Sequence, residues 1–480
     1  MEREVDVVVI GAGPVGENVA DRARAAGLDV VLVEHELVGG ECSFWACVPS
    51  KTLLRSAAAL RAAQRVGGAA EAVTGPLDVA AVLKRRDYWV SDWDDAGAAK
   101  WVASVGIELA RGHGRLDGPR RVVVASADGT ETTFAARHAV VVSTGSDPAI
   151  PPIAGLAEAS PWTSRDATSV EEPPARLAII GGGFVAVEMA TAFAGFGTEV
   201  TVLARHEVLG DMEDFVGDAV VEGLRGLGAT VRLGVEPTEV ERNGSGEVVL
   251  TLDDDSTVTA DEVLVATGRV PRSRSVGLET VGLEPGSWLD VDETMLVRGA
   301  EGDGDWLYAV GDINHRALLT HQGKYQGRAA GDVIAARAAG RPVDDAPWGA
   351  HVATADHSAV PGVVFGEPEA VSVGLTEAAA RRAGREVRLA DVPMQSASGA
   401  GILADGYEGR ARLVVDAERD VGIGATFVGQ DVAELLHAAT IAVVGEVPVS
   451  RLWHAVPAFP TMSEVWLRLL EDLGRPEVDA

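Results

Sequence analysis

The chain's only two cysteines, Cys42 and Cys47, are five residues apart. On a regular helix, residues with this spacing point about 140° apart, so a disulfide between them needs a distorted turn. Gly39 and Gly40 before the pair and Pro49 after it can supply that turn. A thiolate next to an electron-accepting cofactor and a helix N-terminus is stabilised. The segment predicts a redox-active pair; the alternative is two buried structural thiols.

Two glycine-rich turns, at residues 11–16 and 181–186, each follow an apolar strand and open a helix. The first glycine of such a turn permits a tight bend, and the second lets a pyrophosphate approach the backbone. The phosphate then lies at the helix N-terminus, where free N–H groups favour an anion. Two copies of this pattern predict two dinucleotide-binding folds.

The residues after the second strand of each copy indicate which nucleotide binds. Glu34 ends the strand of the first copy, where a carboxylate accepts hydrogen bonds from a ribose 2′-hydroxyl. The second copy has Arg205 and His206 at the corresponding place and no acid. A guanidinium attracts a 2′-phosphate, so NADPH is favoured over NADH. The alternative is that Arg205 only solvates a strand end.

The composition narrows the class of protein. The chain has 480 residues, of which 47% are hydrophobic and 24% charged, with a formal net charge of −31. This charge repels nucleic acid. No apolar run approaches the roughly 18 residues that span a bilayer, and an acidic N-terminus leads directly into a strand, so we expect a cytoplasmic protein. Two cysteines are too few for a disulfide-stapled secreted fold or a Cys-rich zinc site, and no metal site is expected.

Taken together, these motifs resemble the FAD-dependent pyridine nucleotide-disulfide oxidoreductases, which include dihydrolipoamide dehydrogenase, glutathione reductase and mercuric reductase. The resemblance covers nearly all of the chain. It depends on the first glycine turn, on the Gly-Gly-x-Cys-x4-Cys-x-Pro-Ser-Lys stretch at 39–51, on Thr-Gly strand ends at 144–145 and 267–268, and on residues 308–312.

The resemblance implies an α/β fold with two Rossmann-like dinucleotide-binding domains and a C-terminal α+β dimerisation domain. The FAD domain is expected at 1–150 and 271–345, the NAD(P) domain at 151–270 and the dimerisation domain at 351–480. A homodimer is implied, in which the C-terminal end of one chain completes the active site of its partner.

The resemblance also implies roles for individual residues. Cys47 is the charge-transfer thiolate beside the flavin, and Cys42 is the interchange thiol that meets the acceptor. Lys51 lies near flavin N5 and pairs with Glu188. Asp312 bonds the ribityl chain of FAD.

Phe184 gates the nicotinamide pocket in this comparison. The residues expected to bind the cofactors are Gly11, Gly13, Pro14, Gly16, Glu34, Gly40, Lys51, Gly114, Thr144, Gly145 and Asp312 for FAD, and Gly181, Gly183, Phe184, Val185, Glu188, Arg205 and Gly268 for the nicotinamide nucleotide.

One departure from the family lies near the C-terminus. Disulfide-reducing members carry His-Pro-Thr, with the histidine as acid–base and a glutamate five residues later that orients it. Here Phe459 replaces the histidine, although Glu464 is kept as a catalytic candidate. His454 could substitute only if the loop bends back. A C-terminal cysteine pair is absent as well, which argues against mercury reduction by that route.

Aromatic residues surround the expected exchange site. Phe44 and Trp45 lie inside the cysteine motif, and Phe459 of a second copy would face the same pocket. They serve either as core packing or as the wall of an apolar acceptor site.

Three functions remain open from the sequence. The first is an NAD(P)H-dependent disulfide reductase, or a dithiol oxidase in the reverse direction. The second is an NAD(P)H:acceptor reductase acting on a quinone, a metal ion or another one-electron acceptor. The third is a flavoprotein kept as a binding or sensing module.

Overall fold

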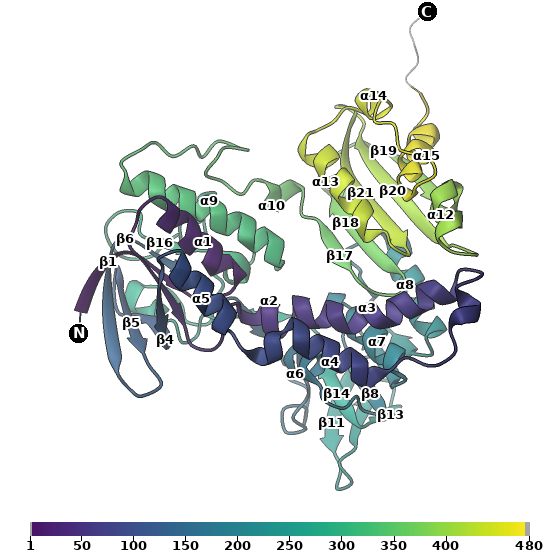
Figure 1. Cartoon of the computed structure of the whole chain (residues 1–480), viewed down its shortest axis with the longest axis horizontal. Coiled ribbons are helices and arrows are strands. Elements are labelled where there is room, and N and C mark those ends of the chain that lie inside the picture. Colours follow the sequence, from purple (N-terminus) through teal and green to yellow (C-terminus); the bar gives the residue numbers. More distant parts are fainter. Residues whose placement is uncertain (1, 476–480) are drawn as a thin grey trace, which may run out of the picture. The chain divides into compact units, whose positions relative to one another are not determined.

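The computed structural model describes residues 2–475, which form two compact units (Figure 1). Unit 1 contains the chain up to Pro49, Asp87–Ala149 and Arg269–His357. Unit 2 contains Ser50–Arg86, Ile150–Gly268 and the described chain from Ser358. The expected α/β class is confirmed. The division into three domains stays a prediction, since the contacts place Ser50–Arg86 with unit 2.

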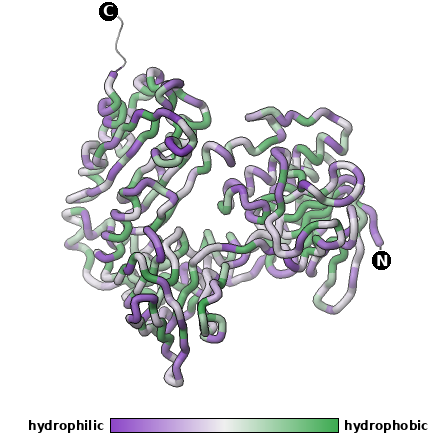
Figure 2. The backbone as a smooth tube through the Cα atoms, turned by 180° about the vertical axis from the view of Figure 1, so that it is seen from behind, coloured by the Kyte–Doolittle hydropathy of each residue, from purple (hydrophilic) through white to green (hydrophobic). Residues whose placement is uncertain are grey.

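A seven-stranded sheet forms the centre of unit 1. Its strand order is β3-β2-β1-β6-β5-β4, with β16 also paired to β6. The core strands are runs of valine and isoleucine that are buried on both faces, as in a parallel sheet covered by helices (Figure 2). The strands of unit 1 are β1 (Glu2–Ile10), β2 (Val30–Glu34), β3 (Glu108–Arg111), β4 (His113–Leu116), β5 (Arg121–Ala125), β6 (Glu131–Val142), β7 (Ser146–Pro148), β15 (Arg269–Pro271) and β16 (Leu307–Ala309).

Helices α1 and α9 lie side by side in unit 1 (Figure 1). Their close approach is possible because small residues, among them Gly327 and Gly331 of α9, face α1. The helices of unit 1 are α1 (Pro14–Ala25), α2 (Gly40–Phe44), α5 (Ala96–Ser104) and α9 (Thr320–Ala338), with short turns η2 (Ser91–Trp93), η3 (Leu278–Val281) and η4 (Gly311–Asn314). Helices α3 (Cys47–Gln64), α4 (Val79–Trp89) and α10 (Ala355–Ser358) run across the boundaries between the two units.

The middle part of unit 2 is a second parallel sheet with the order β10-β9-β8-β14, next to a three-stranded antiparallel sheet β11-β12-β13. The apolar helix α7 packs against β8 and β9. The elements are α6 (Ser164–Ser169), β8 (Arg176–Ile180), α7 (Phe184–Phe196), β9 (Glu199–Ala204), α8 (Asp214–Gly226), β10 (Thr230–Leu233), β11 (Pro237–Arg242), β12 (Val248–Leu252), β13 (Thr257–Ala260) and β14 (Glu262–Val265).

The C-terminal part of unit 2 is a five-stranded antiparallel sheet in the order β17-β18-β21-β20-β19. Helices α13 and α15 pack on it (Figure 1). The elements are β17 (Gly362–Val364), β18 (Glu369–Gly374), α11 (Glu377–Arg382), β19 (Val387–Pro393), α12 (Ser398–Leu403), β20 (Gly409–Asp416), β21 (Val421–Gly429), α13 (Leu436–Val444), α14 (Val449–Leu452) and α15 (Val465–Leu473), with short turns η5 (Met394–Ser396), η6 (Ala433–Leu435) and η7 (Met462–Glu464). A further short turn of unit 2, η1 (Ala70–Ala72), lies in the segment Ser50–Arg86.

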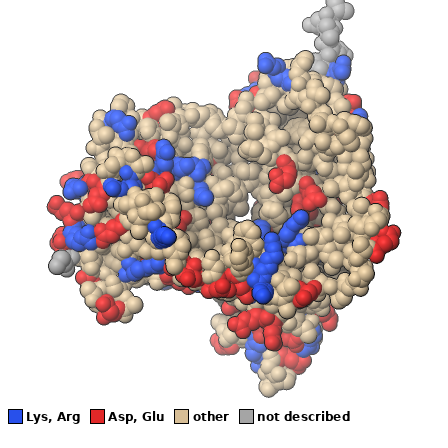
Figure 3. Space-filling view, viewed as in Figure 1, with Lys and Arg blue, Asp and Glu red and all other residues tan. Residues whose placement is uncertain are grey.

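On the face of the molecule shown in Figure 3, acidic and basic residues are interspersed. Within residues 2–475, no helix is long and apolar enough to cross a membrane. The same residues contain no group of three or more histidine, cysteine or acidic side chains arranged to hold a metal ion.

Candidate active site

The first glycine turn lies at the carboxyl edge of the unit 1 sheet. Gly11 has a φ of +105°, and a Cβ there would lie 2.4 Å from the carbonyl oxygen of Ser143. A Cβ on Gly16 would lie 2.0 Å from the carbonyl oxygen of Gly11. These two positions therefore require glycine. At Gly13, which precedes α1, a Cβ would meet nothing within 4 Å, so the backbone is open to a pyrophosphate at the N-terminus of α1.

Glu34, at the end of β2, fastens this turn to the sheet. Its side chain is buried, and it accepts hydrogen bonds of 2.8 Å from the amides of Ala12 and Glu36. Burial alone would raise the pKa of Glu34, but hydrogen bonds from His35, Glu36 and Ala12 outweigh it and lower the pKa. A carboxylate has about four acceptor sites, so ribose hydroxyls can still be bound. The residue fits its expected FAD role.

A second group of polar residues follows β6 and β16. The Ser146 hydroxyl donates to the Asp312 carboxylate at 2.6 Å, and Arg269 lies 3.7 Å from the same oxygen. The hydroxyl of Thr144 is buried and has no hydrogen-bond partner among the described residues. Gly114 is buried on β4, where a Cβ would lie 2.9 Å from Val33. An unpartnered buried hydroxyl and an open glycine turn at one edge fit a bound FAD.

The cysteine segment is tied to the same glycine turn. The Gly39 amide donates to the carbonyl of Ala12 at 2.8 Å, and a Cβ on Gly40 would lie 2.9 Å from Cα of Gly13. Cys42 lies in α2, and Cys47 is the first residue of α3. Both side chains are half-buried. The start of the cysteine segment thus lies next to the turn expected to hold the FAD pyrophosphate.

Cys47 has a neighbour that the sequence did not single out. Its sulfur lies 3.3 Å from the hydroxyl of Thr320, the first residue of α9. The two residues are 273 positions apart, so only the folded structure brings them together.

In unit 2, Lys51 and Glu188 form an ion pair with a nitrogen–oxygen distance of 2.7 Å. Glu188 is buried, and its other oxygen accepts a hydrogen bond of 3.2 Å from the amide of Phe365. The Lys51 ammonium also lies 5.3 Å from the centre of the Phe365 ring, within the range of a cation–π interaction. The contacts hold the lysine at one position.

The second glycine turn repeats the geometry of the first. Gly181 has a φ of +133°, and a Cβ there would lie 2.2 Å from the carbonyl oxygen of Ala266. Gly183 is open, like Gly13, and precedes α7. Ala186, at the place of the third glycine, is fully buried. The turn fits a second nucleotide.

Two further residues of the predicted nucleotide site open α7, and one follows β14. Phe184 is half-buried, and its ring lies close to the position that a Cβ on Gly362 would occupy. Val185 is 36% exposed. At Gly268, a Cβ would meet nothing within 4 Å.

Arg205 follows β9 and is exposed. Its guanidinium lies 3.2 Å from the carboxylate of Glu236 and donates to His206 at 3.1 Å. Glu236 therefore partly neutralises the cation that the sequence offers to a 2′-phosphate. Sequence reasoning missed this carboxylate, which lies 31 residues downstream.

Comparison with known proteins agrees with this geometry. Residues 5–327 match the family model described as pyridine nucleotide-disulphide oxidoreductase, and residues 360–469 match the dimerisation domain of that family. The chain belongs to this family. It is a flavin-dependent enzyme that uses FAD and a pyridine nucleotide, moves a hydride through the flavin and acts on sulfur groups, and its dimerisation domain supports a homodimer.

The relatives differ in their names. The chain is 33% identical to a dihydrolipoyl dehydrogenase from Thermus scotoductus. The alignment of 485 residues covers 98% of this chain and 98% of the relative. It is 30% identical to a mercuric reductase from Staphylococcus aureus, over 96% of this chain and 81% of the relative. Its fold matches the Cu(II) complex of the HOCl-induced flavoprotein disulfide reductase RclA from Escherichia coli with a TM-score of 0.82, at 23% identity and covering 98% and 99% of the two chains.

Phe459 occupies the position at which disulfide-reducing members of this family carry the acid–base histidine. Its side chain is 75% exposed. Glu464 is buried and accepts a hydrogen bond of 3.3 Å from the amide of Gly399. His454 is exposed, and its backbone amide donates a hydrogen bond to the backbone carbonyl of Arg451. Phe459 and Val456, which is 84% exposed, add to the apolar surface that the dimerisation domain presents.

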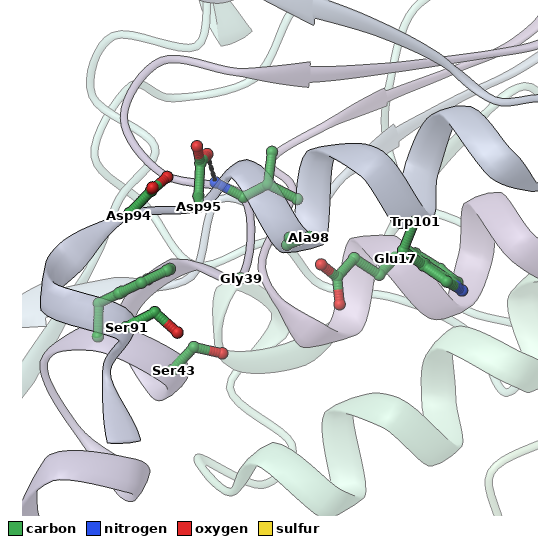
Figure 4. Close-up of a pocket in the computed structure, with 11 residues that line it drawn as sticks. Glu17, Gly39, Ser43, Ser91, Asp94, Asp95, Ala98 and Trp101 are labelled. Carbon is green, nitrogen blue, oxygen red and sulfur yellow. Dashed lines mark hydrogen bonds between the residues drawn. The ribbon is translucent and has the colours of Figure 1, made fainter. Parts of the chain in front are cut away.

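An acidic pocket of about 440 Å³ lies in unit 1 beside the cysteine segment (Figure 4). Phe44 lines it and is only 5% exposed, so this aromatic residue packs inside the fold, whereas Trp45 is half-buried. Glu17 of α1 and Trp101 of α5 both line the pocket. Burial raises the pKa of Glu17 to about 7; Lys324 opposes this shift and Glu34 adds to it.

This pKa predicts how stability depends on pH. The folded pKa of about 7 lies above the ordinary glutamate pKa of 4.5, so ionisation of Glu17 lowers the stability of the folded protein. That cost begins as the pH rises above the unfolded pKa and is complete above the folded one. A Glu17→Gln variant should unfold at the wild-type temperature near pH 4.5 and be more stable at pH 8 by on the order of 2 kcal/mol.

Thermal unfolding of both proteins from pH 4.5 to 8.5 checks this expectation. Glu222→Gln, at an exposed position of α8, serves as the control and should follow the wild type throughout. A Glu17→Gln advantage that is the same at every pH would contradict the assignment.

Proposed function

We propose that electrons leave the flavin through the Cys42–Cys47 pair and reduce a disulfide. The overall reaction converts NAD(P)H, a disulfide and a proton into NAD(P)⁺ and two thiols. Bound FAD would accept the hydride from the nicotinamide and pass its two electrons on to the disulfide. The observation that carries the proposal is the attachment of the cysteine segment to the first glycine turn, through Gly39 and Gly40.

In this proposal the two cysteines have different tasks. Cys47 begins α3, and free N–H groups at a helix N-terminus stabilise a thiolate. We assign it the side of the flavin. Cys42, in the preceding short helix α2, is the thiol that forms the mixed disulfide with the acceptor.

Lys51 supplies a positive charge near the flavin ring in this proposal. The buried Glu188 carboxylate holds the ammonium, and the Phe365 backbone holds the carboxylate. The pair keeps the lysine in one position without leaving a buried charge uncompensated.

An acceptor panel on a Cys42→Ser variant tests the exchange role. Turnover of lipoamide, glutathione disulfide and other oxidised low-molecular-weight thiols should fall at least a thousandfold, since the mixed disulfide cannot form. Ser43→Ala, the neighbouring position in α2, is the matched control and should keep wild-type turnover. Undiminished disulfide turnover in Cys42→Ser would overturn the proposal.

A second candidate is an NAD(P)H:acceptor reductase that passes electrons to a quinone or a metal ion. Phe459 favours it, because a phenyl ring can neither give nor take a proton. The name of one relative, a mercuric reductase, agrees with a metal acceptor. Quinone or metal turnover that survives in Cys42→Ser would support this candidate, and loss of every activity would exclude it.

Restoring the missing acid–base group is a gain-of-function test. A positioned general acid–base contributes about 10²–10⁴-fold to a rate. Phe459→His should raise disulfide turnover at least tenfold and introduce a pH dependence near the ordinary histidine pKa of about 6.5, with quinone turnover unchanged. Phe459→Leu is the control. If the histidine variant is no faster than the leucine variant, the phenylalanine is not what limits disulfide exchange.

We further propose that NADPH is preferred over NADH, through Arg205. The exposed Arg205–Glu236 pair contributes little free energy by itself, so a 2′-phosphate can displace Glu236 from the guanidinium. The Glu236 carboxylate then repels that phosphate and limits the preference.

Steady-state kinetics with both nucleotides test this proposal. Arg205→Leu should raise KM for NADPH about tenfold and leave KM for NADH unchanged, because only NADPH carries the 2′-phosphate. Glu236→Gln should lower KM for NADPH several-fold. Arg232→Leu, which removes a neighbouring arginine paired with Asp254, is the control. If the ratio of KM for NADPH to KM for NADH is unchanged in Arg205→Leu, the proposed role of Arg205 is refuted.

A further inference from the structure

The Thr320 hydroxyl is within hydrogen-bond distance of Cys47, with 3.3 Å between oxygen and sulfur. Either atom can be the donor while the cysteine is a thiol. Once the cysteine ionises, the sulfur can only accept, and the threonine hydroxyl becomes the donor. The contact therefore favours the thiolate, because a hydrogen bond to a charged group is stronger than one between neutral groups.

The two residues that form this contact each begin a helix. Cys47 is the first residue of α3, which has 18 residues, and Thr320 is the first residue of α9, which has 19. The N-terminus of a helix carries a partial positive charge that stabilises a nearby anion. The beginnings of α3 and α9 thus act in the same direction as the Thr320 hydrogen bond.

The start of α9 is fixed by a buried polar network in unit 1. The side-chain amides of Gln322 and Gln326 each donate to a carboxylate oxygen of Asp356 at 2.8 Å. The side-chain oxygen Oε1 of Gln326 accepts hydrogen bonds of 2.8 Å from the backbone amide of Gly311 and the side-chain amide of Asn314. These five groups are buried. The network leaves Thr320 little freedom to move away from the sulfur.

We infer that Thr320 is a catalytic residue of this enzyme, whose hydroxyl donates to the Cys47 thiolate and holds the sulfur in its reactive position. The inference rests on the proposed role of Cys47. It gives a structural reason for the different tasks of the two cysteines, since this hydroxyl and the start of α9 act on Cys47. No proton is consumed in the step, because the hydroxyl keeps its proton while it donates.

The test uses the FAD-loaded enzyme with Cys42→Ser, in which Cys47 is the one remaining cysteine. A Cys47 thiolate beside oxidised flavin gives a long-wavelength charge-transfer absorbance. Adding Thr320→Val removes the hydroxyl at nearly constant volume, and it should reduce the ratio of thiolate to thiol about tenfold, as expected for losing one hydrogen bond to a charged group. Adding Thr320→Ser should restore most of the absorbance. Thr440→Val, on α13, is the control.

Each outcome decides a different claim. If Cys42→Ser alone lacks the absorbance, the flavin-side role of Cys47 is wrong and the inference falls with it. If that variant has the absorbance and Thr320→Val keeps it undiminished, the proposed function stands and the role of Thr320 is refuted.

A second measurement is needed if the Thr320→Val variant loses its FAD, because the charge-transfer absorbance then cannot be observed. In that case the rate at which iodoacetamide alkylates Cys47, followed by mass spectrometry in the same three variants, decides. Slowing by valine and recovery by serine support the inference, and equal rates overturn it.

Discussion

The parallel register of four strands in unit 1 is the constraint on which the rest of the site depends. Ile10 pairs with Val33 on one side and with Val142 on the other, and Ala309 pairs with Val142. Because parallel strands end at the same edge, the first glycine turn and the residues after β2, β6 and β16 are brought together. The cysteine segment is then fastened to that turn, and η4 leads on to α9. A change of one residue in this register would displace the first glycine turn relative to the residues after β2, β6 and β16.

The electrostatics of unit 1 follow from that edge. The N-terminus of α1 is open at Gly13 for a pyrophosphate, and the N-termini of α3 and α9 meet at Cys47. In the proposed function, the positive ends of these three helices would stabilise two anions, the FAD pyrophosphate and the Cys47 thiolate. In unit 2 the positive charge comes from a side chain, the Lys51 ammonium, which forms an ion pair with the buried carboxylate of Glu188.

The sequence predicted the local parts of this site and missed the non-local ones. The glycine turns and the cysteine segment are short motifs, so their residue types alone indicate their shape. The contact between Lys51 and Glu188 was expected only through the family resemblance. Thr320 and Glu236 could not be found in this way, because each meets its partner, Cys47 or Arg205, only after the sheets have formed. The grouping of Ser50–Arg86 with unit 2 also depends on packing that no motif records.

The central claim is that the cysteine pair stores electrons from the pyridine nucleotide. An anaerobic reductive titration of the FAD-loaded enzyme, followed by its absorbance, measures this capacity directly. We expect the enzyme to take up four electrons per FAD, two in the flavin and two in the Cys42–Cys47 pair, with a thiolate charge-transfer absorbance after the first two. Uptake of only two electrons, with direct bleaching of the flavin, would contradict it.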